Sequence, residues 1–367
     1  DRLELNDVLA QMTAHVGILH SQTAVRELRR GQDEVETSHL AADFAPVDGG
    51  LKVTALHSGD PELLEERSPL ARPEAGIQVG DVVQAVNHQP VAHERDLGLL
   101  LRGQAGRPVL LSLRSAKGET RQVLVQPVAV ARDNELRYLS WEWDRKRRVE
   151  KLGAERIGYL HLQAMGKNDI ARWAREYYPV FEKEGLIIDL RNNGGGNIDR
   201  WILEKLLRRP WVWWQQGNQQ QPVSNPPYAV RGNVVAIIDG DTYSDGETFA
   251  LGLQRLGIAT LIGTPTSGAG MWLSDTNTAR DKGIARAASS PQFVVKPDGS
   301  TQWVVEGVGV KPDVEVDNPP HASFKGQDAQ LEAAVKWLLQ RMGPKDQGPP
   351  KAPAGGAQGS RYRGFGQ

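Results

Sequence analysis

The stretch that most constrains the fold of this chain is residues 233–257, NVVAIIDGDTYSDGETFALGLQRLG. It begins with an apolar run, residues 234–238, that is typical of a buried strand, and it ends with apolar residues at helical spacing. A strand that enters a helix through a tight turn exposes a side chain at the helix N-terminus, where free backbone N–H groups favour negative charge. Ser244 is at this point. It is either the N-cap of the helix or an acyl-transfer nucleophile beside an oxyanion hole.

Strands and helices alternate in the same way through the whole C-terminal half. This alternation predicts a parallel or mixed sheet with helices on both faces, which is an α/β (or mixed α+β) fold class. The strands are expected at residues 156–162, 185–191 and 233–238, and the helices at residues 168–183, 201–208, 246–256 and 328–341. Residues 1–20 also show the apolar spacing of an amphipathic helix, through Leu3, Leu5, Val8, Leu9 and Met12.

Residues 40–130 have a different sequence pattern, which predicts short strands separated by turns. The string GIQVGDVVQAVNHQPV, residues 76–91, together with a following helix and two more strands, resembles a PDZ domain. PDZ domains bind extended peptides as an added strand at a sheet edge. The alternative is a β-rich packing module without a ligand.

Composition excludes several classes of function. The net charge of −1 gives no reason to expect a nucleic acid or a membrane surface as partner. The absence of cysteine excludes disulfides and a cysteine nucleophile, and it fits a reducing compartment. We therefore expect a cytoplasmic protein, with the periplasm as the alternative if a leader peptide precedes this sequence. No histidine or acidic spacing matches a metal site, so no metal and no cofactor are expected.

Four pieces of the C-terminal half are rich in small and polar residues. Three consecutive glycines after a buried strand let backbone amides approach a ligand, as in an oxyanion hole or a phosphate cradle. The glycine turn lacks a Gly-Lys-Ser/Thr ending, which argues against a P-loop. The four pieces are DLRNNGGGN at residues 189–197, SDGE at 244–247, GTPTSGAG at 263–270 and VEGVGVKPD at 305–313.

Together these pieces resemble family S41 serine peptidases, which include the C-terminal processing peptidases and the tricorn proteases. The resemblance implies a ClpP/crotonase-like βαβ core with an inserted PDZ domain and an N-terminal helical segment. The domains would be residues 1–38 (helical segment of the core), 39–130 (PDZ-like), 131–342 (catalytic) and 343–367 (disordered tail). It further implies a homo-oligomer, hexameric in full tricorn proteases, and β-propeller domains ahead of this region in a longer chain.

The general base separates the two branches of the family. Processing peptidases are expected to carry a lysine between two glycines after the nucleophile helix, but this chain has Ala269 there, and Lys282 lies outside the motif. The tricorn branch instead uses a histidine that comes before the PDZ domain. His20 and His39 are the two candidates, and we favour His20 because it ends the first helical segment.

The resemblance then assigns the roles. Ser244 attacks a peptide carbonyl, His20 takes its proton, and Glu306 orients the histidine, with or without an intervening hydroxyl. The Asp245 amide and an amide of Gly194 or Gly195 hold the oxyanion. The substrate is expected to be an oligopeptide or an unfolded chain. The alternatives are a processing peptidase with an unrecognised base, and a peptide-binding protein without catalysis on the same fold.

Overall fold

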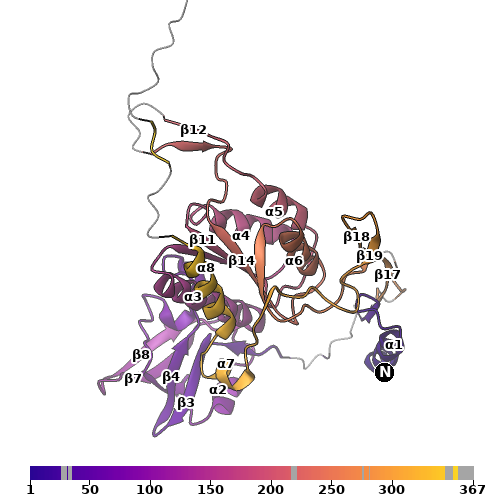
Figure 1. The fold of residues 1–367 in the computed structure, drawn as a ribbon. Coiled ribbons are helices and arrows are strands. Elements are labelled where there is room, and N and C mark those ends of the chain that lie inside the picture. The colour runs from indigo at the N-terminus through magenta and orange to yellow at the C-terminus, as the bar shows by residue number, and fades with distance from the viewer. Residues whose placement is uncertain are drawn as a thin grey trace, which may run out of the picture. The chain divides into compact units, whose positions relative to one another are not determined.

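The structure, a computed structural model, describes residues 1–25, 31, 35–215, 221–274, 277–280, 282–343 and 350–353. Two compact units make up the chain (Figure 1). The larger unit consists of Asp1–Leu28 and Arg148–Gln367, and the smaller unit is Arg29–Arg147. The expected disordered tail, residues 343–367, lies mostly outside the described residues.

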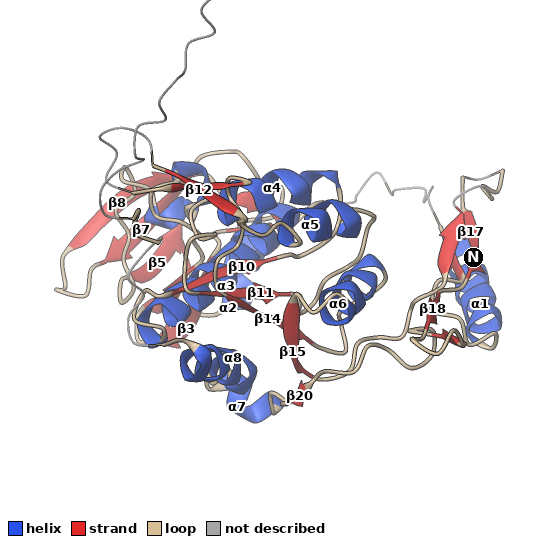
Figure 2. Cartoon of the chain, turned by 45° about the horizontal axis from the view of Figure 1, so that its top comes forward, coloured by secondary structure: helices blue, strands red, loops and turns tan. Residues whose placement is uncertain are grey.

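A five-stranded parallel sheet forms the centre of the larger unit. Helices α4 (Lys167–Tyr177), α5 (Asp199–Leu206) and α6 (Asp245–Arg255) cover one face of this sheet, and α8 (Ala329–Arg341) covers the other (Figure 2). The α/β fold class is therefore confirmed for this unit. Its strands, in spatial order, are β10 (Ile157–His161), β11 (Gly185–Asp189), β14 (Asn233–Ile238), β15 (Ala259–Gly263) and β20 (Val314–Glu315).

The apolar run of β14 is continuous because both faces of this strand are buried. Val234, Ala236 and Ile238 pack on the side of α4, α5 and α6. Val235 and Ile237 point to the opposite face and pack with residues of α8. Alternate side chains of a strand point to opposite faces, so a strand in the middle of a covered sheet is apolar at every position.

Among its described residues, the larger unit also has three small antiparallel sheets. In one of them, β1 (Gln22–Ala24) pairs with β17 (Ile284–Ser290), and this pairing holds the segment that follows the first helix. That helix, α1, spans Arg2–Ala14 and ends earlier than expected, and Gly17 has a φ of 72°. The remaining elements are β16 (Trp272–Ser274), which pairs with β17, β12 (Val212–Trp214) with β13 (Val223–Asn225), β18 (Phe293–Val295) with β19 (Thr301–Trp303), and α7 (Pro320–Phe324).

The apolar residues of the first helix do not pack into the core of the larger unit. Leu3, Leu5, Val8 and Met12 are all exposed, and α1 buries no residue. The apolar spacing gave the correct element type, because side chains three and four apart share one helix face. It does not say whether that face meets the rest of the unit.

The smaller unit has its own core around a sheet in the order β3-β4-β5-β7-β8, with β6 paired to β5. The helix α2 (Glu94–Leu100) and the 3₁₀ turns η1 (Leu64–Glu66) and η2 (Pro69–Ala71) belong to this unit. One long helix, α3 (Val130–Leu152), follows β9. The strands are β2 (Ser38–His39), β3 (Ala42–Val47), β4 (Gly50–Leu56), β5 (Val82–Val86), β6 (Gln89–Pro90), β7 (Val109–Arg114), β8 (Thr120–Val125) and β9 (Val128–Ala129), which pairs with β2.

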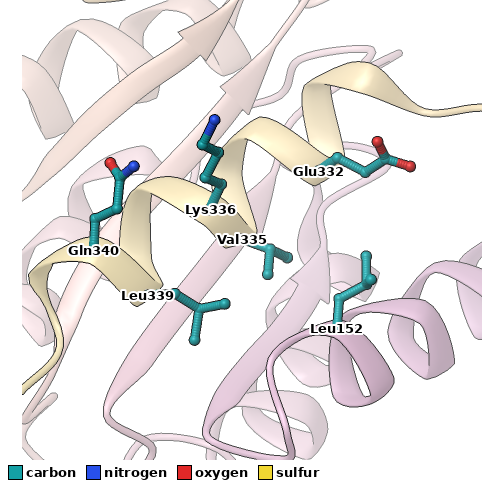
Figure 3. A pocket seen from close by; sticks show the side chains of 6 residues that line it. All are labelled: Leu152, Glu332, Val335, Lys336, Leu339 and Gln340. Atoms are coloured by element: carbon teal, nitrogen blue, oxygen red, sulfur yellow. The ribbon is translucent and has the colours of Figure 1, made fainter. Parts of the chain in front are cut away.

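A hollow of about 450 Å³ lies between α8 and the end of α3 (Figure 3). Val335 and Leu339 of α8 and Leu152 of α3 form its apolar part. Glu332, Lys336 and Gln340 complete the lining. No residue that the sequence marks for chemistry lies in this hollow.

Candidate active site

Ser244 occupies a strained turn between β14 and α6. Its φ of 56° and ψ of −120° lie in a region that non-glycine residues rarely adopt, at a typical cost of about 1–3 kcal/mol. The same strand–turn–helix geometry presents the nucleophile in other serine hydrolases. Gly195 of the glycine turn is so close that a Cβ atom there would lie 2.5 Å from the Ser244 Cβ. The turn after β11 and the turn after β14 therefore meet at this serine.

His20 lies against Ser244 although 224 positions separate the two residues in the sequence. Its Nε2 is 2.9 Å from the Ser244 Oγ, and the side chain is 4% exposed. The Tyr243 ring packs on the imidazole with centroids 4.8 Å apart, and the Tyr243 hydroxyl donates to the Leu19 carbonyl at 3.3 Å. The β1–β17 pairing and these two contacts hold the histidine at the serine.

The environment keeps His20 neutral. Burial is the largest influence and lowers its pKa, because removal from water disfavours the charged imidazolium. The Glu306 carboxylate and a hydrogen bond to the Met271 backbone oppose this effect and raise the pKa, while Arg286 lowers it. A neutral imidazole can accept a proton, which is the state that a general base needs.

Glu306 lies at the start of the Glu-Gly-Val-Gly turn, and one of its carboxylate oxygens accepts a hydrogen bond. Its Oε2 accepts the Met271 N–H at 2.6 Å. Its Oε1 is buried and has no hydrogen-bond partner among the described atoms. The carboxylate therefore acts on the imidazole through its charge, without a direct hydrogen bond between the two side chains.

The three amides expected to bind an oxyanion differ in their state. The Asp245 N–H is at the first position of α6, where a helix offers no internal acceptor. The Gly194 N–H donates to the Gln163 carbonyl at 2.9 Å. The Gly195 N–H donates to the Asn193 Oδ1, also at 2.9 Å. An oxyanion at the glycine turn thus has to replace one of these two acceptors.

Glu247 is a site residue that the sequence analysis missed. Its fully buried carboxylate accepts hydrogen bonds from the Thr266 hydroxyl and from the amides of Gly268, Ala269 and Ser244, at 2.6–3.1 Å. Burial raises its pKa, and these hydrogen bonds oppose the rise. The spacing Ser-x-x-Glu of a capping box is a signal that would have found it. Glu247 fixes the serine amide to the loop in which processing peptidases would carry their lysine.

A second missed group, under the turn after β11, is a buried ion cluster. Arg191 donates to Asp189 at 2.6 Å and to Asp328 at 2.8 Å, and all three side chains are buried. Tyr159 adds its hydroxyl to Asp189 at 3.0 Å. Burial alone would raise the pKa of Asp189, but the charge and the hydrogen bonds of Arg191 outweigh it and lower the pKa. This cluster ties the turn to the N-terminus of α8.

His39, the less favoured base, belongs to the smaller unit. It lies on β2, and its Nδ1 is 3.7 Å from the Asp133 carboxylate. It also lines a groove of about 910 Å³ whose walls include β3 and α2. The strand β3 is at the edge of its sheet, which is the arrangement that strand addition by a peptide requires.

Comparisons with known proteins match two parts of this chain to known families. Residues 156–316 match Peptidase family S41, and residues 38–130 match the Tricorn protease PDZ domain. Tricorn protease homolog 1 of Streptomyces coelicolor is 34% identical over 86% of this chain and 29% of its own length. Putative tricorn protease homolog 2 of the same organism is 30% identical over 96% of this chain and 30% of its own length. A crystal structure of the tricorn protease matches with a TM-score of 0.84 and 26% identity, over 93% of this chain and 32% of that one.

The fold, the serine site and these matches define one class, the serine peptidases. The chain belongs to peptidase family S41, on its tricorn side, and it includes a tricorn-type PDZ domain. It spans about 30% of the length of the curated relatives named above. Among the described residues, no helix is long and apolar enough to cross a membrane.

Proposed function

We propose that this chain hydrolyses peptide bonds of oligopeptides or unfolded chains, with Ser244 as nucleophile and His20 as general base. The observation that carries the proposal is the 2.9 Å distance between the His20 Nε2 and the Ser244 Oγ. A base within hydrogen-bond reach of the hydroxyl is the first geometric requirement for such a pair. The lowered pKa of the buried His20 supplies the second, a neutral imidazole near neutral pH.

The reaction runs in two halves. The His20 Nε2 takes the hydroxyl proton while the Ser244 Oγ bonds to the substrate carbonyl carbon, and the carbonyl oxygen becomes an oxyanion. The tetrahedral intermediate collapses, the C–N bond breaks, and the leaving amine receives the proton from His20. Water then attacks the acyl-enzyme with His20 again as base, which releases the acid and restores Ser244. Glu306 stabilises the transient imidazolium through its negative charge.

The oxyanion binds to the Asp245 amide and to the Gly195 amide. The Asp245 amide lies beside this turn, since a Cβ on Gly195 would be 3.1 Å from the Asp245 nitrogen. The Gly195 amide exchanges the Asn193 side-chain oxygen for the oxyanion. A charged acceptor bonds more strongly than a neutral amide oxygen, so the exchange is favourable once the oxyanion forms.

Active-site labelling tests the proposal. A fluorophosphonate probe should modify Ser244, as read by mass spectrometry of the labelled peptide, and the Ser244→Ala variant should not be labelled. A wild-type protein that carries no label, in a preparation that still binds peptides, would instead support a peptide-binding protein without catalysis. The Ser–Lys alternative has no support in the geometry, because Ala269 stands at the lysine position and its amide bonds to Glu247.

The smaller unit would present the substrate chain. We infer that an extended peptide segment adds to the edge strand β3, in the groove beside α2. The homo-oligomer and the further domains of a longer chain, both expected from the family, are predictions as well. Size-exclusion chromatography with light scattering measures the oligomeric state of this chain.

A further inference from the structure

Gln292 has no role in the proposed reaction, yet its side chain joins two parts of the candidate site. Its Nε2 donates to the Gly270 carbonyl at 2.8 Å and to the Thr248 hydroxyl at 3.0 Å. A main-chain carbonyl can only accept, so the NH2 group of the amide has to face it. Thr248 is in the first turn of α6, where its N–H donates to the Ser244 carbonyl at 3.2 Å. One amide group therefore connects the helix of the nucleophile with the loop that ends at Gly270.

The peptide group between Gly270 and Met271 is held at both of its polar atoms. Its carbonyl oxygen accepts from Gln292, and its N–H donates to the Glu306 Oε2 at 2.6 Å. The group is also tightly packed, since a Cβ on Gly270 would lie 2.5 Å from the Val305 Cβ and 3.0 Å from the Glu306 nitrogen. A peptide group is planar and rigid, so the contact that fixes its oxygen also fixes its N–H. The Gln292 amide thus holds the donor to which Glu306 is bound.

The main chain of Gln292 leads to the same carboxylate. Gln292 directly precedes β18, and its carbonyl accepts the Val304 N–H at 3.0 Å directly after β19. The two strands pair as a hairpin (Figure 1), and the Phe293 and Trp303 rings pack edge to face with centroids 5.6 Å apart. Gln292 and the turn of Glu306 therefore start from the same end of one paired hairpin.

The position of Glu306 matters for His20, the base of the proposed reaction. Burial is the largest influence on the pKa of His20 and lowers it, whereas Glu306 and a hydrogen bond to the Met271 backbone raise it, and Arg286 of β17 lowers it. The Tyr243 ring, which packs on the imidazole, stays neutral because burial raises its pKa. Among the described residues, Glu306 is therefore the anion that stabilises a proton on His20.

We propose that Gln292 is a positioning residue that holds the Glu306 carboxylate beside His20. It acts through the peptide group between Gly270 and Met271, which it ties to α6. Without this tie, the peptide and the carboxylate move away from the imidazole, and the imidazolium that forms during acylation loses part of its stabilisation. This inference rests on the proposed peptidase function and adds a residue from outside the four motifs to it.

The test is the pH dependence of Ser244 acylation by the fluorophosphonate probe, between about pH 4 and 9, in the wild type and in Gln292→Met. Methionine keeps the length of the side chain but cannot donate to either acceptor. We expect the rate at neutral pH to fall by about tenfold or less. We also expect the acid limb of the profile to move to lower pH, because the base is active when neutral and a weaker effect of Glu306 lowers its pKa.

Gln254→Met is the matched control. Gln254 is also on α6, and its Nε2 donates to two acceptors, the Lys311 carbonyl at 3.2 Å and the Asp313 carboxylate at 2.7 Å. This variant should leave the acid limb in place. An equal move of the limb in Gln254→Met and Gln292→Met would overturn the inference.

The Glu306→Gln background shows whether Gln292 acts through the charge of Glu306. There, Gln292→Met should move the acid limb by much less than it does in the wild-type background. An equal move in both backgrounds, a move to higher pH, or a slower rate with an unmoved limb would also overturn the inference. A wild-type protein without any label on Ser244 would instead overturn the proposed function, so the two failures are distinguishable.

Discussion

The turns after β11 and β14 lie side by side, and their buried carboxylates have different partners. In the turn after β11, Arg191 pairs with Asp189 and Asp328 and keeps Asp189 ionised. In the turn after β14, the carboxyls of Asp245 and Glu247 are equally buried and accept hydrogen bonds from backbone amides and, at Glu247, from a hydroxyl. Burial therefore raises both of their pKa values.

This difference indicates that the two groups of buried charges have different roles. An ion cluster with its own guanidinium stays charged over the working pH range, so it fixes a turn permanently. Burial raises the pKa of Asp245 to about 7 and also raises the pKa of Glu247, and both carboxyls lie beside the residue that would do the chemistry. The Arg191 ion cluster under the first turn is therefore predicted to set stability, the groups that touch Ser244 are predicted to set activity, and the following variants test that division.

The largest effect is expected at Ser244. Ser244→Ala should lower peptide hydrolysis by about 10⁶, the size found when a nucleophile is removed from a serine peptidase. The unfolding free energy should not fall, because the strained φ of 56° is no worse for alanine. Hydrolysis of a fluorogenic peptide and urea denaturation measure the two quantities. A variant that keeps a tenth or more of the activity would refute the nucleophile assignment.

Arg191→Met is expected to act on stability. It leaves two buried carboxylates without a cation, which costs about 3–5 kcal/mol of unfolding free energy. Urea denaturation measures the loss. Arg156→Met is the matched control, because Arg156 pairs with the partly exposed Glu184 and should cost less. Equal losses in the two variants would contradict the distinction between the buried cluster and an ordinary ion pair.

Gly195→Ala should act on activity. The new Cβ would lie 2.5 Å from the Ser244 Cβ, so the turn has to move, and kcat should fall by about 10²–10³ as one oxyanion donor is lost. The control is Gly257→Ala. Its φ of 63° imposes similar backbone strain, but a Cβ there meets nothing within 4 Å. Steady-state kinetics that show equal losses in both variants would assign the effect to strain alone.

Glu306→Gln should have the smallest effect. The charge of Glu306 raises the pKa of His20 against the larger lowering by burial, so its removal lowers that pKa further. Because the base is active when neutral, the acid limb of the pH–rate profile should move to lower pH. The rate at neutral pH should fall by about tenfold or less, which corresponds to roughly 1 kcal/mol. A move of the acid limb to higher pH would contradict the sign of this interaction.

The sequence predicted the parallel sheet and its helices because continuous apolar strands and helical spacing are local signals. It placed α6 and α8 within one residue of their observed starts and ends. The helix predicted at residues 1–20 was too long, because a pattern of apolar residues does not show where a helix ends. The same pattern does not show whether the apolar side chains of a helix are buried, and those of α1 are exposed.

The candidate site was partly predictable. Ser244, Glu306 and the glycine turn stand in short motifs, whereas the approach of His20 depends on the β1–β17 pairing across the whole sequence. The choice between His20 and His39 came from resemblance and not from any local signal. The carboxyls of Asp245 and Glu247 and the Arg191 cluster were missed, because charged residues are normally assigned to the surface unless a structure shows their partners.

The central claim is that His20 activates Ser244, and the rate of Ser244 acylation tests it most directly. Fluorophosphonate labelling should be followed by mass spectrometry at neutral pH in the wild type, His20→Ala and His39→Ala. We predict that His20→Ala slows acylation by about 10²–10⁴, the usual contribution of a general base, and that His39→Ala leaves it unchanged. An unchanged rate in His20→Ala, or a comparable loss in His39→Ala, would contradict the account.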